Sequence, residues 1–142
     1  MKQCHLLQMA LFFLKKCLEI ENKYAILSND SIWRYKMKNK AVELFSAVPK
    51  MHNCAQAVAS AAGRDDLLEN MKLCGGGRAP ENICGALFAA MFIAGDENSL
   101  KIREEFASDF GAVTCSGLKN DKHIPCIDCV KKAAELLEKY GR

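Results

Sequence analysis

The sequence contains no apolar run of about 20 residues, the length that a membrane-spanning helix needs. An apolar stretch at residues 6–14 is shorter than that, and two lysines follow it directly. It could be the core of a signal peptide, but no small-x-small cleavage site comes after it. We therefore expect a cytoplasmic protein without a membrane span. We interpret residues 6–14 as a short amphipathic helix or as part of an extension outside the domain.

The sequence also lacks internal repeats, low-complexity tracts and any sustained alternation of apolar and polar residues. These absences argue against a repeat array, a disordered chain and a β-sheet protein. What is present is 142 residues, 50% hydrophobic and 26% charged, which suits one ordinary domain with its own core. Few residues are β-branched, and apolar residues recur at helical spacing from Ala41 onward. We predict an all-α fold.

The expected architecture is a compact bundle of five to six short helices with a buried cysteine cluster. Pro80 suits the first turn of a helix, where a missing amide proton costs nothing, and Gly63, Gly95 and Gly111 stand where helices should end. Asp65 suits a helix start because carboxylates stabilise the positive end of the helix dipole. The predicted helices lie at about 38–47, 52–63, 65–74, 80–94, 97–110 and 124–140.

Positive charge is concentrated at the N-terminus. Residues 1–40 carry eight basic and three acidic side chains, a net charge of +5, whereas the rest of the chain has a net charge of −2. We divide the chain into a basic extension, residues 1–37, which could be helical, and a cysteine-centred domain, residues 38–142. Translation starting at Met37 is one hypothesis for this boundary. No nucleic-acid-binding motif accompanies the basic residues, so we expect no nucleic-acid partner.

Eight cysteines are many for a chain of this size. In a secreted protein they would indicate a disulfide framework, whereas in a cytoplasmic protein they indicate metal binding or catalysis. Four of them lie far apart in the sequence, and three of these four stand at or beside expected helix starts. A fold that brings scattered thiols together favours redox chemistry or metal binding. The four are Cys54, Cys84, Cys115 and Cys126.

The helix expected around Cys84 has two faces. Its large apolar residues form one stripe, and its small residues form a face that another helix could approach closely, which makes a homodimer plausible. Thiol pKa values fall near helix N-termini and cations, so we expect lowered pKa values for Cys84 and Cys126, near Arg78 and His123 in sequence. The stripe consists of Cys84, Leu87, Phe88, Met91 and Phe92, and the small face of Gly85, Ala86, Ala89 and Ala90.

Four segments match a known cysteine pattern in order: Asn53-Cys54-Ala55-Gln56-Ala57-Val58, Gly75-Gly76-Gly77 with Cys84-Gly85-Ala86, Thr114-Cys115-Ser116-Gly117-Leu118, and Cys126 with Val130 and Ala133-Ala134. On these segments, residues 40–140 resemble the C_GCAxxG_C_C family of small redox-active bacterial and archaeal proteins, whose core motif reads CGAxxG. One position departs from that motif, because Ala89 stands where the family has its closing glycine. The resemblance implies a redox function and leaves the reaction open.

We therefore expect electron transfer or thiol–disulfide exchange through Cys54, Cys84, Cys115 and Cys126. The protein would then be a candidate oxidoreductase, and the identity of its redox partner is open. One alternative is a metal-binding or iron–sulfur module that uses the same cysteines, holding zinc or a cluster as cofactor, with Gly85 and Ala86 beside it. Another is a helical structural or interaction protein whose cysteines only pack. The roles of two further thiols are left open. Cys74 has no counterpart in the family pattern. Cys129 could be an exposed, incidental thiol or a zinc ligand with His123 and Cys126.

Overall fold

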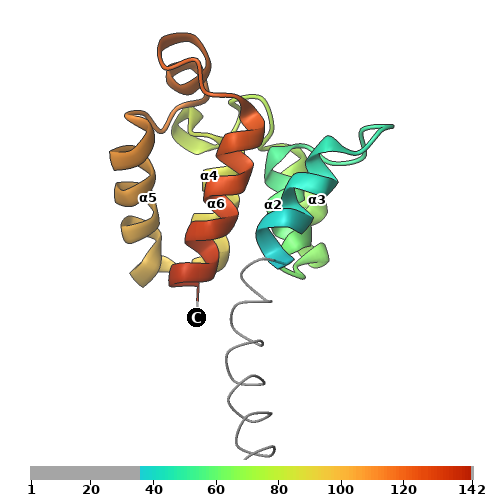
Figure 1. Cartoon of the computed structure of the whole chain (residues 1–142). Coiled ribbons are helices and arrows are strands. Elements are labelled where there is room, and N and C mark those ends of the chain that lie inside the picture. The colour runs from blue at the N-terminus through green and yellow to red at the C-terminus, as the bar shows by residue number, and fades with distance from the viewer. Residues whose placement is uncertain (1–35, 142) are drawn as a thin grey trace, which may run out of the picture. The chain divides into compact units, whose positions relative to one another are not determined.

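The computed structural model describes residues 36–141, and these residues form helices and loops without a β-strand. Residues 36–46 are helical, and five labelled α-helices follow (Figure 1). They are α2 (Cys54–Ala61), α3 (Leu68–Lys72), α4 (Gly85–Ala94), α5 (Asp96–Phe110) and α6 (Cys126–Tyr140). The all-α prediction is confirmed. The predictions for residues 1–35 lie outside the described residues.

The central helix is α4, which packs against α2, α5 and α6. Its side chains are apolar on all faces, as expected for a helix enclosed by neighbours. The small-residue face is the one that lies in the core, whereas the large apolar stripe is only partly covered and Phe92 is 55% exposed. At Gly85, a Cβ atom would lie 3.4 Å from the Ala55 Cβ of α2. The chain's own helices therefore cover the surface from which we had argued for a homodimer, whose existence stays untested.

The helix predicted from residue 80 begins later, at Gly85. Pro80–Asn82 form a separate 3₁₀ turn that ends with Glu81 and Asn82 in the left-handed region, at φ of 58° and 57°. Ile83 then pairs with Thr114 in an isolated antiparallel bridge, and the Cys84 N–H donates to the Val113 carbonyl at 2.8 Å. This contact between distant segments outweighs the local preference for helix that the proline indicated.

Other predicted boundaries hold more closely. Asn53 caps α2 and forms a reciprocal capping box with Gln56, and its Nδ2 also donates to the Met71 carbonyl beside α3. Gly63 and Gly111, at φ of 75° and 73°, follow α2 and α5 as expected. The segment predicted as one helix at 65–74 is a 3₁₀ turn at Asp65–Leu67 followed by α3. A π-helical turn at Gly117–Asp121 was not predicted.

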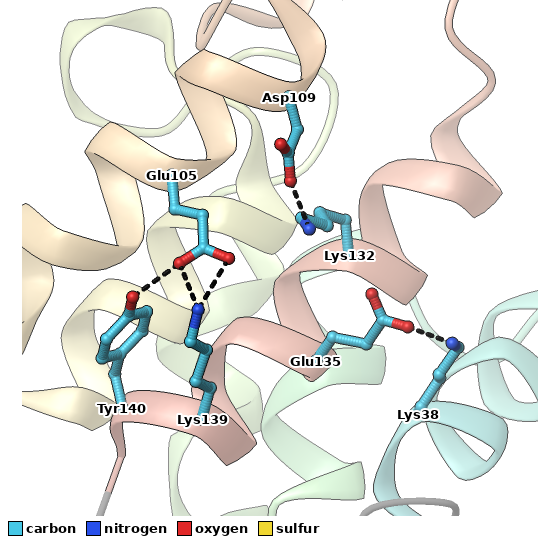
Figure 2. Close-up of polar contacts among 7 residues, drawn as sticks. All are labelled: Lys38, Glu105, Asp109, Lys132, Glu135, Lys139 and Tyr140. Atoms are coloured by element: carbon cyan, nitrogen blue, oxygen red, sulfur yellow. Dashed lines mark hydrogen bonds and ion pairs between the residues drawn. The ribbon is translucent and has the colours of Figure 1, made fainter.

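Ion pairs connect α6 to its neighbours (Figure 2). Glu105 of α5 accepts hydrogen bonds from Lys139 Nζ at 2.8 Å and from the Tyr140 hydroxyl at 2.6 Å. Further along the same pair of helices, Lys132 pairs with Asp109. On the other side of α6, Glu135 pairs with Lys38 from the helix at 36–46.

Among the helices at residues 36–141, none is both long enough and apolar enough to span a membrane.

Candidate thiol site

The N-termini of α2, α4 and α6 present three of the four cysteines selected from the sequence. Cys54 and Cys126 are the first residues of α2 and α6, and Cys84 is the N-cap of α4. The expectation that three of the cysteines stand at helix starts is confirmed. Cys115 lies in the loop between α5 and α6, next to the residue whose bridge to Ile83 aligns that loop with the start of α4.

The four cysteines are related through their pKa values. Burial is the main cause of the raised pKa of Cys54 and of Cys115, and Cys84 and Cys126 add smaller contributions to both. All four are free thiols. Their burial differs, however: Cys84 is only 6% exposed, whereas Cys54, Cys115 and Cys126 are half-buried. The predicted buried cluster is therefore not shown: one of the four thiols is buried, and the other three retain access to solvent.

Two glycines make room for the thiols. A Cβ atom on Gly85 would lie 2.8 Å from Cys54 Sγ and 2.5 Å from the Cys74 carbonyl oxygen, both too close for a side chain. Gly77, at φ of +80°, would place a Cβ atom 3.2 Å from the Cβ of Cys115. The glycines of the motif thus have a packing role beside sulfur atoms. Whether Gly85 and Ala86 also contact a cofactor, as we predicted, is untested.

The expectation of lowered thiol pKa values is wrong for Cys84, whose pKa lies well above its ordinary value. Its contact with Cys129 and its burial raise the pKa, and the N–H groups of Leu87 and Ala86 offset only part of that rise. Burial likewise raises the pKa of Cys54, although the N–H groups of Ala55 and Ala86 act in the opposite direction. Placement at a helix N-terminus is favourable to a thiolate, but desolvation has the larger effect here.

Lys119 is the cation that acts on the thiols. Burial raises the pKa of Cys115, and Lys119 lowers it in part. The pKa of Lys119 is itself raised, mainly by Cys126 and Cys115 and to a smaller extent by Cys54. Sequence analysis missed this residue, although it stands four positions after Cys115, a spacing that brings side chains together on a helical turn. The turn itself was not predicted.

The cations that the sequence did suggest have other surroundings. The Arg78 side chain is exposed and its Nε donates to the Gly75 carbonyl at 3.0 Å, closing the glycine turn. His123 is exposed, at φ of 55°. Sequence proximity to Cys84 and Cys126 was therefore a poor guide, because the fold turns these two side chains toward local backbone or solvent.

Cys129 belongs to the core and not to the surface. It is 3% exposed, which contradicts the interpretation of an exposed, incidental thiol. Cys129 is also the main cause of the raised pKa of Cys84, which relates this buried thiol of α6 to the N-cap of α4. A signal was present in the sequence: Cys129, Ala133 and Leu136 follow the periodicity of a helix face, and all three are buried.

The arrangement gives no support to a metal centre. Within residues 36–141, no three His, Cys, Asp or Glu side chains are grouped so that they could hold a metal ion. The zinc and iron–sulfur alternatives stay untested predictions. Cys74 is half-buried, and its thiol donates to the Asn70 carbonyl at 3.7 Å.

A surface pocket of about 380 Å³ adjoins the site at Cys115. Its lining comes from the glycine turn, the turn before α4 and the π-helical turn, and it contains Gly76, Gly77, Asn82, Cys115, Ser116, Lys119 and Asn120.

Comparison with known proteins produced no match to a family model, to a curated protein or to a solved structure. The family resemblance therefore stays a prediction that rests on the cysteine pattern alone.

Proposed function

We propose that the protein is a small redox protein that performs thiol–disulfide exchange through Cys54, Cys84, Cys115 and Cys126. The observation that carries this proposal is that Lys119 and the free thiol of Cys115 line the same surface pocket. Cys126 and Cys115 raise the pKa of Lys119, in keeping with a cation close to these thiols. A neighbouring cation favours the thiolate, which is the form that attacks disulfides. Thiols that served only as core packing would have no need of such a neighbour.

The proposed reaction transfers two electrons from the protein to a low-molecular-weight disulfide. One cysteine thiolate forms a bond to a sulfur of that disulfide, whose S–S bond breaks and releases the other half as a thiolate. The Cys84 thiolate then attacks the cysteine sulfur of the mixed disulfide and releases the remaining half. The Cys129 thiolate next attacks the Cys84 sulfur of this first protein disulfide, and the thiol that met the substrate leaves with the electron pair. The protein gains one disulfide, and the substrate becomes two thiols that carry the two protons.

We assign the resulting protein disulfide to Cys84 and Cys129. Cys129 is the main cause of the raised pKa of Cys84, and both residues are buried, so the bond would be shielded from external reductants. Cys54 and Cys115 are more accessible and both interact with Cys84. These half-buried thiols are therefore the ones we expect to meet the substrate first.

The test counts free thiols in the reduced full-length chain, by alkylation and mass spectrometry, before and after anaerobic treatment with a low-molecular-weight disulfide. We expect the reversible loss of two thiols per chain in the wild type, and no stable intramolecular disulfide in Cys84→Ala or Cys129→Ala. Helical content measured by circular dichroism should be retained. Cys74→Ala is the matched control and should cycle like the wild type, because Cys74 contacts the Asn70 carbonyl and not these thiols.

Two results would overturn the proposal. If Cys84→Ala and Cys129→Ala both cycle normally, the buried pair plays no part; if in addition no cysteine variant alters cycling, the thiols only pack. Near-stoichiometric iron or zinc in protein purified without oxygen would instead make the cysteines ligands. We would measure metal and sulfide content first, since that result decides how every later thiol count is interpreted.

A further inference from the structure

The pocket beside Cys115 has the composition of a binding site for a small anion. Its side chains are all polar, and none of the residues that line it, all of them within the described part of the chain, carries a carboxylate. Lys119 contributes the positive charge, while Asn82 and Asn120 can donate hydrogen bonds through their amides. Its volume of about 380 Å³ falls in the range of small-molecule sites.

A reactive group lies in the same pocket. Cys115 is a free, half-buried thiol in the lining, and its neighbour Gly77 leaves space over its Cβ atom. A cation and an accessible thiol in one polar pocket match a molecule that carries both a sulfur–sulfur bond and a negative group. The combination would not suit an apolar ligand, which needs apolar walls.

We propose that this pocket binds a small disulfide bearing a carboxylate, with Lys119 recognising the carboxylate and Cys115 attacking the disulfide. This inference rests on the proposed redox function and adds the class of substrate. In the step itself, the Cys115 sulfur forms a bond to one substrate sulfur and the substrate S–S bond breaks. The departing sulfur keeps the electron pair and is protonated by water. Cys115 is thereby oxidised and the departing half is reduced.

The experiment compares three disulfides of different charge: oxidised glutathione, which is anionic, 2-hydroxyethyl disulfide, which is neutral, and cystamine, which is cationic. The initial rate of mixed-disulfide formation at Cys115 is measured by mass spectrometry on the reduced full-length chain. For each protein the readout is the anionic-to-neutral rate ratio. This ratio separates recognition of charge from activation of the thiol, because a change in thiolate content affects all three reagents.

We expect the wild type to prefer the anionic disulfide and Lys119→Gln to lower the anionic-to-neutral ratio by about threefold, the size typical of an exposed charge pair. Lys119→Arg should retain most of the preference, and raised salt should reduce it. Lys122→Gln is the matched control: it removes the same charge from the same segment, but Lys122 packs against Gly111 and does not line the pocket.

The outcomes separate this inference from the function on which it rests. The proposed binding of a carboxylate in this pocket is wrong if the wild type and Lys119→Gln have equal anionic-to-neutral ratios. It is also wrong if Lys122→Gln lowers the ratio as much as Lys119→Gln does. Either result leaves thiol exchange intact. A preference for cystamine would overturn it as well. If none of the three disulfides reacts reversibly with any cysteine, the proposed redox function itself fails.

Discussion

The thiol end of the bundle, which includes Cys54, Cys84 and Cys115, differs sharply from the α5–α6 interface in how it holds titratable groups. At the thiol end, burial raises the thiol pKa values, so the neutral form is favoured. At the α5–α6 interface, Lys139 and Tyr140 lower the pKa of Glu105, so the charged form is favoured (Figure 2). The two regions should therefore lose stability at opposite ends of the pH scale.

The two regions also differ in what their side chains contribute: those at the α5–α6 interface stabilise the fold, whereas those at the thiol end could react. A bundle that only needed stability could use exposed ion pairs such as those of α6, which require no buried thiol. The thiol end instead combines glycines in close contact with sulfur atoms and a lysine next to half-buried thiols. Such local departures from a plain apolar core are typical of functional sites. Substitutions that affect one region and leave the other unchanged test this difference between the thiol end and the α5–α6 interface.

The largest effect should come from Gly85→Ala. Its new Cβ atom would lie 2.5 Å from the Cys74 carbonyl oxygen, a backbone atom that cannot rotate away, and 2.8 Å from Cys54 Sγ. Overpacking of this kind costs about 1–3 kcal/mol, which exceeds the gain in helix propensity at a first-turn position. We expect a lower free energy of unfolding in urea and an altered alkylation rate of Cys54.

Gly63→Ala provides the control for that variant. Gly63, unlike Gly85, is left-handed, at φ of +75°, and a Cβ atom there would meet nothing within 4 Å. Alanine at this position should cost about 1 kcal/mol through backbone strain alone and leave Cys54 alkylation unchanged. If Gly85→Ala has the same free energy of unfolding as the wild type, the thiol end repacks easily, and its glycine is not needed for close packing.

Sequence reasoning was most successful where local chemistry decides the structure. Gly63 after α2 and Gly111 after α5 indicated helix ends that the structure confirms. It failed where distant segments meet. The bridge between Ile83 and Thr114 shortens the predicted helix, and no local signal announces such a bridge.

The candidate site shows the same division. The sequence correctly placed Cys54, Cys84 and Cys126 at helix starts, whereas their role as one site stays a prediction. The predicted direction of the pKa shift of Cys84 was wrong, because desolvation depends on how completely the fold covers a side chain, and sequence spacing does not reveal that. Lys119 was missed because it acts on cysteines that only the tertiary fold brings near it.

A second prediction concerns alkaline pH. The folded chain raises the pKa of Cys84 above the ordinary 9.0, so this thiol contributes stability that is present below pH 9 and is lost as pH rises through the folded pKa. Each thiol protonated only in the folded chain lowers the free energy of unfolding by up to about 1.4 kcal/mol per pH unit. We expect urea unfolding between pH 8 and 10.5 to show this slope, and Cys84→Ala to flatten it.

Cys74→Ala sharpens that measurement. Burial also raises the pKa of Cys74, but this side chain is less enclosed than Cys84, so its removal should flatten the alkaline slope less. Equal slopes in the wild type and Cys84→Ala would contradict the link between thiol burial and alkaline instability.

The smallest effect should come from Glu105→Gln at the α5–α6 interface. Lys139 and Tyr140 hold the pKa of Glu105 below the ordinary 4.5, so its contribution is present above pH 4.5 and is lost as pH falls through the lower, folded value. The group is largely solvated, and screening limits the loss to about 1 kcal/mol or less at neutral pH.

The measurement is the unfolding midpoint of Glu105→Gln and of the wild type from pH 2.5 to 7. The two midpoints should coincide in acid and differ above pH 4.5. Glu104→Gln, on the same helix, should not reproduce that separation. Because the thiols are protonated throughout this range, the alkaline slope of Glu105→Gln should match the wild type, and a changed slope would show that the two regions are coupled.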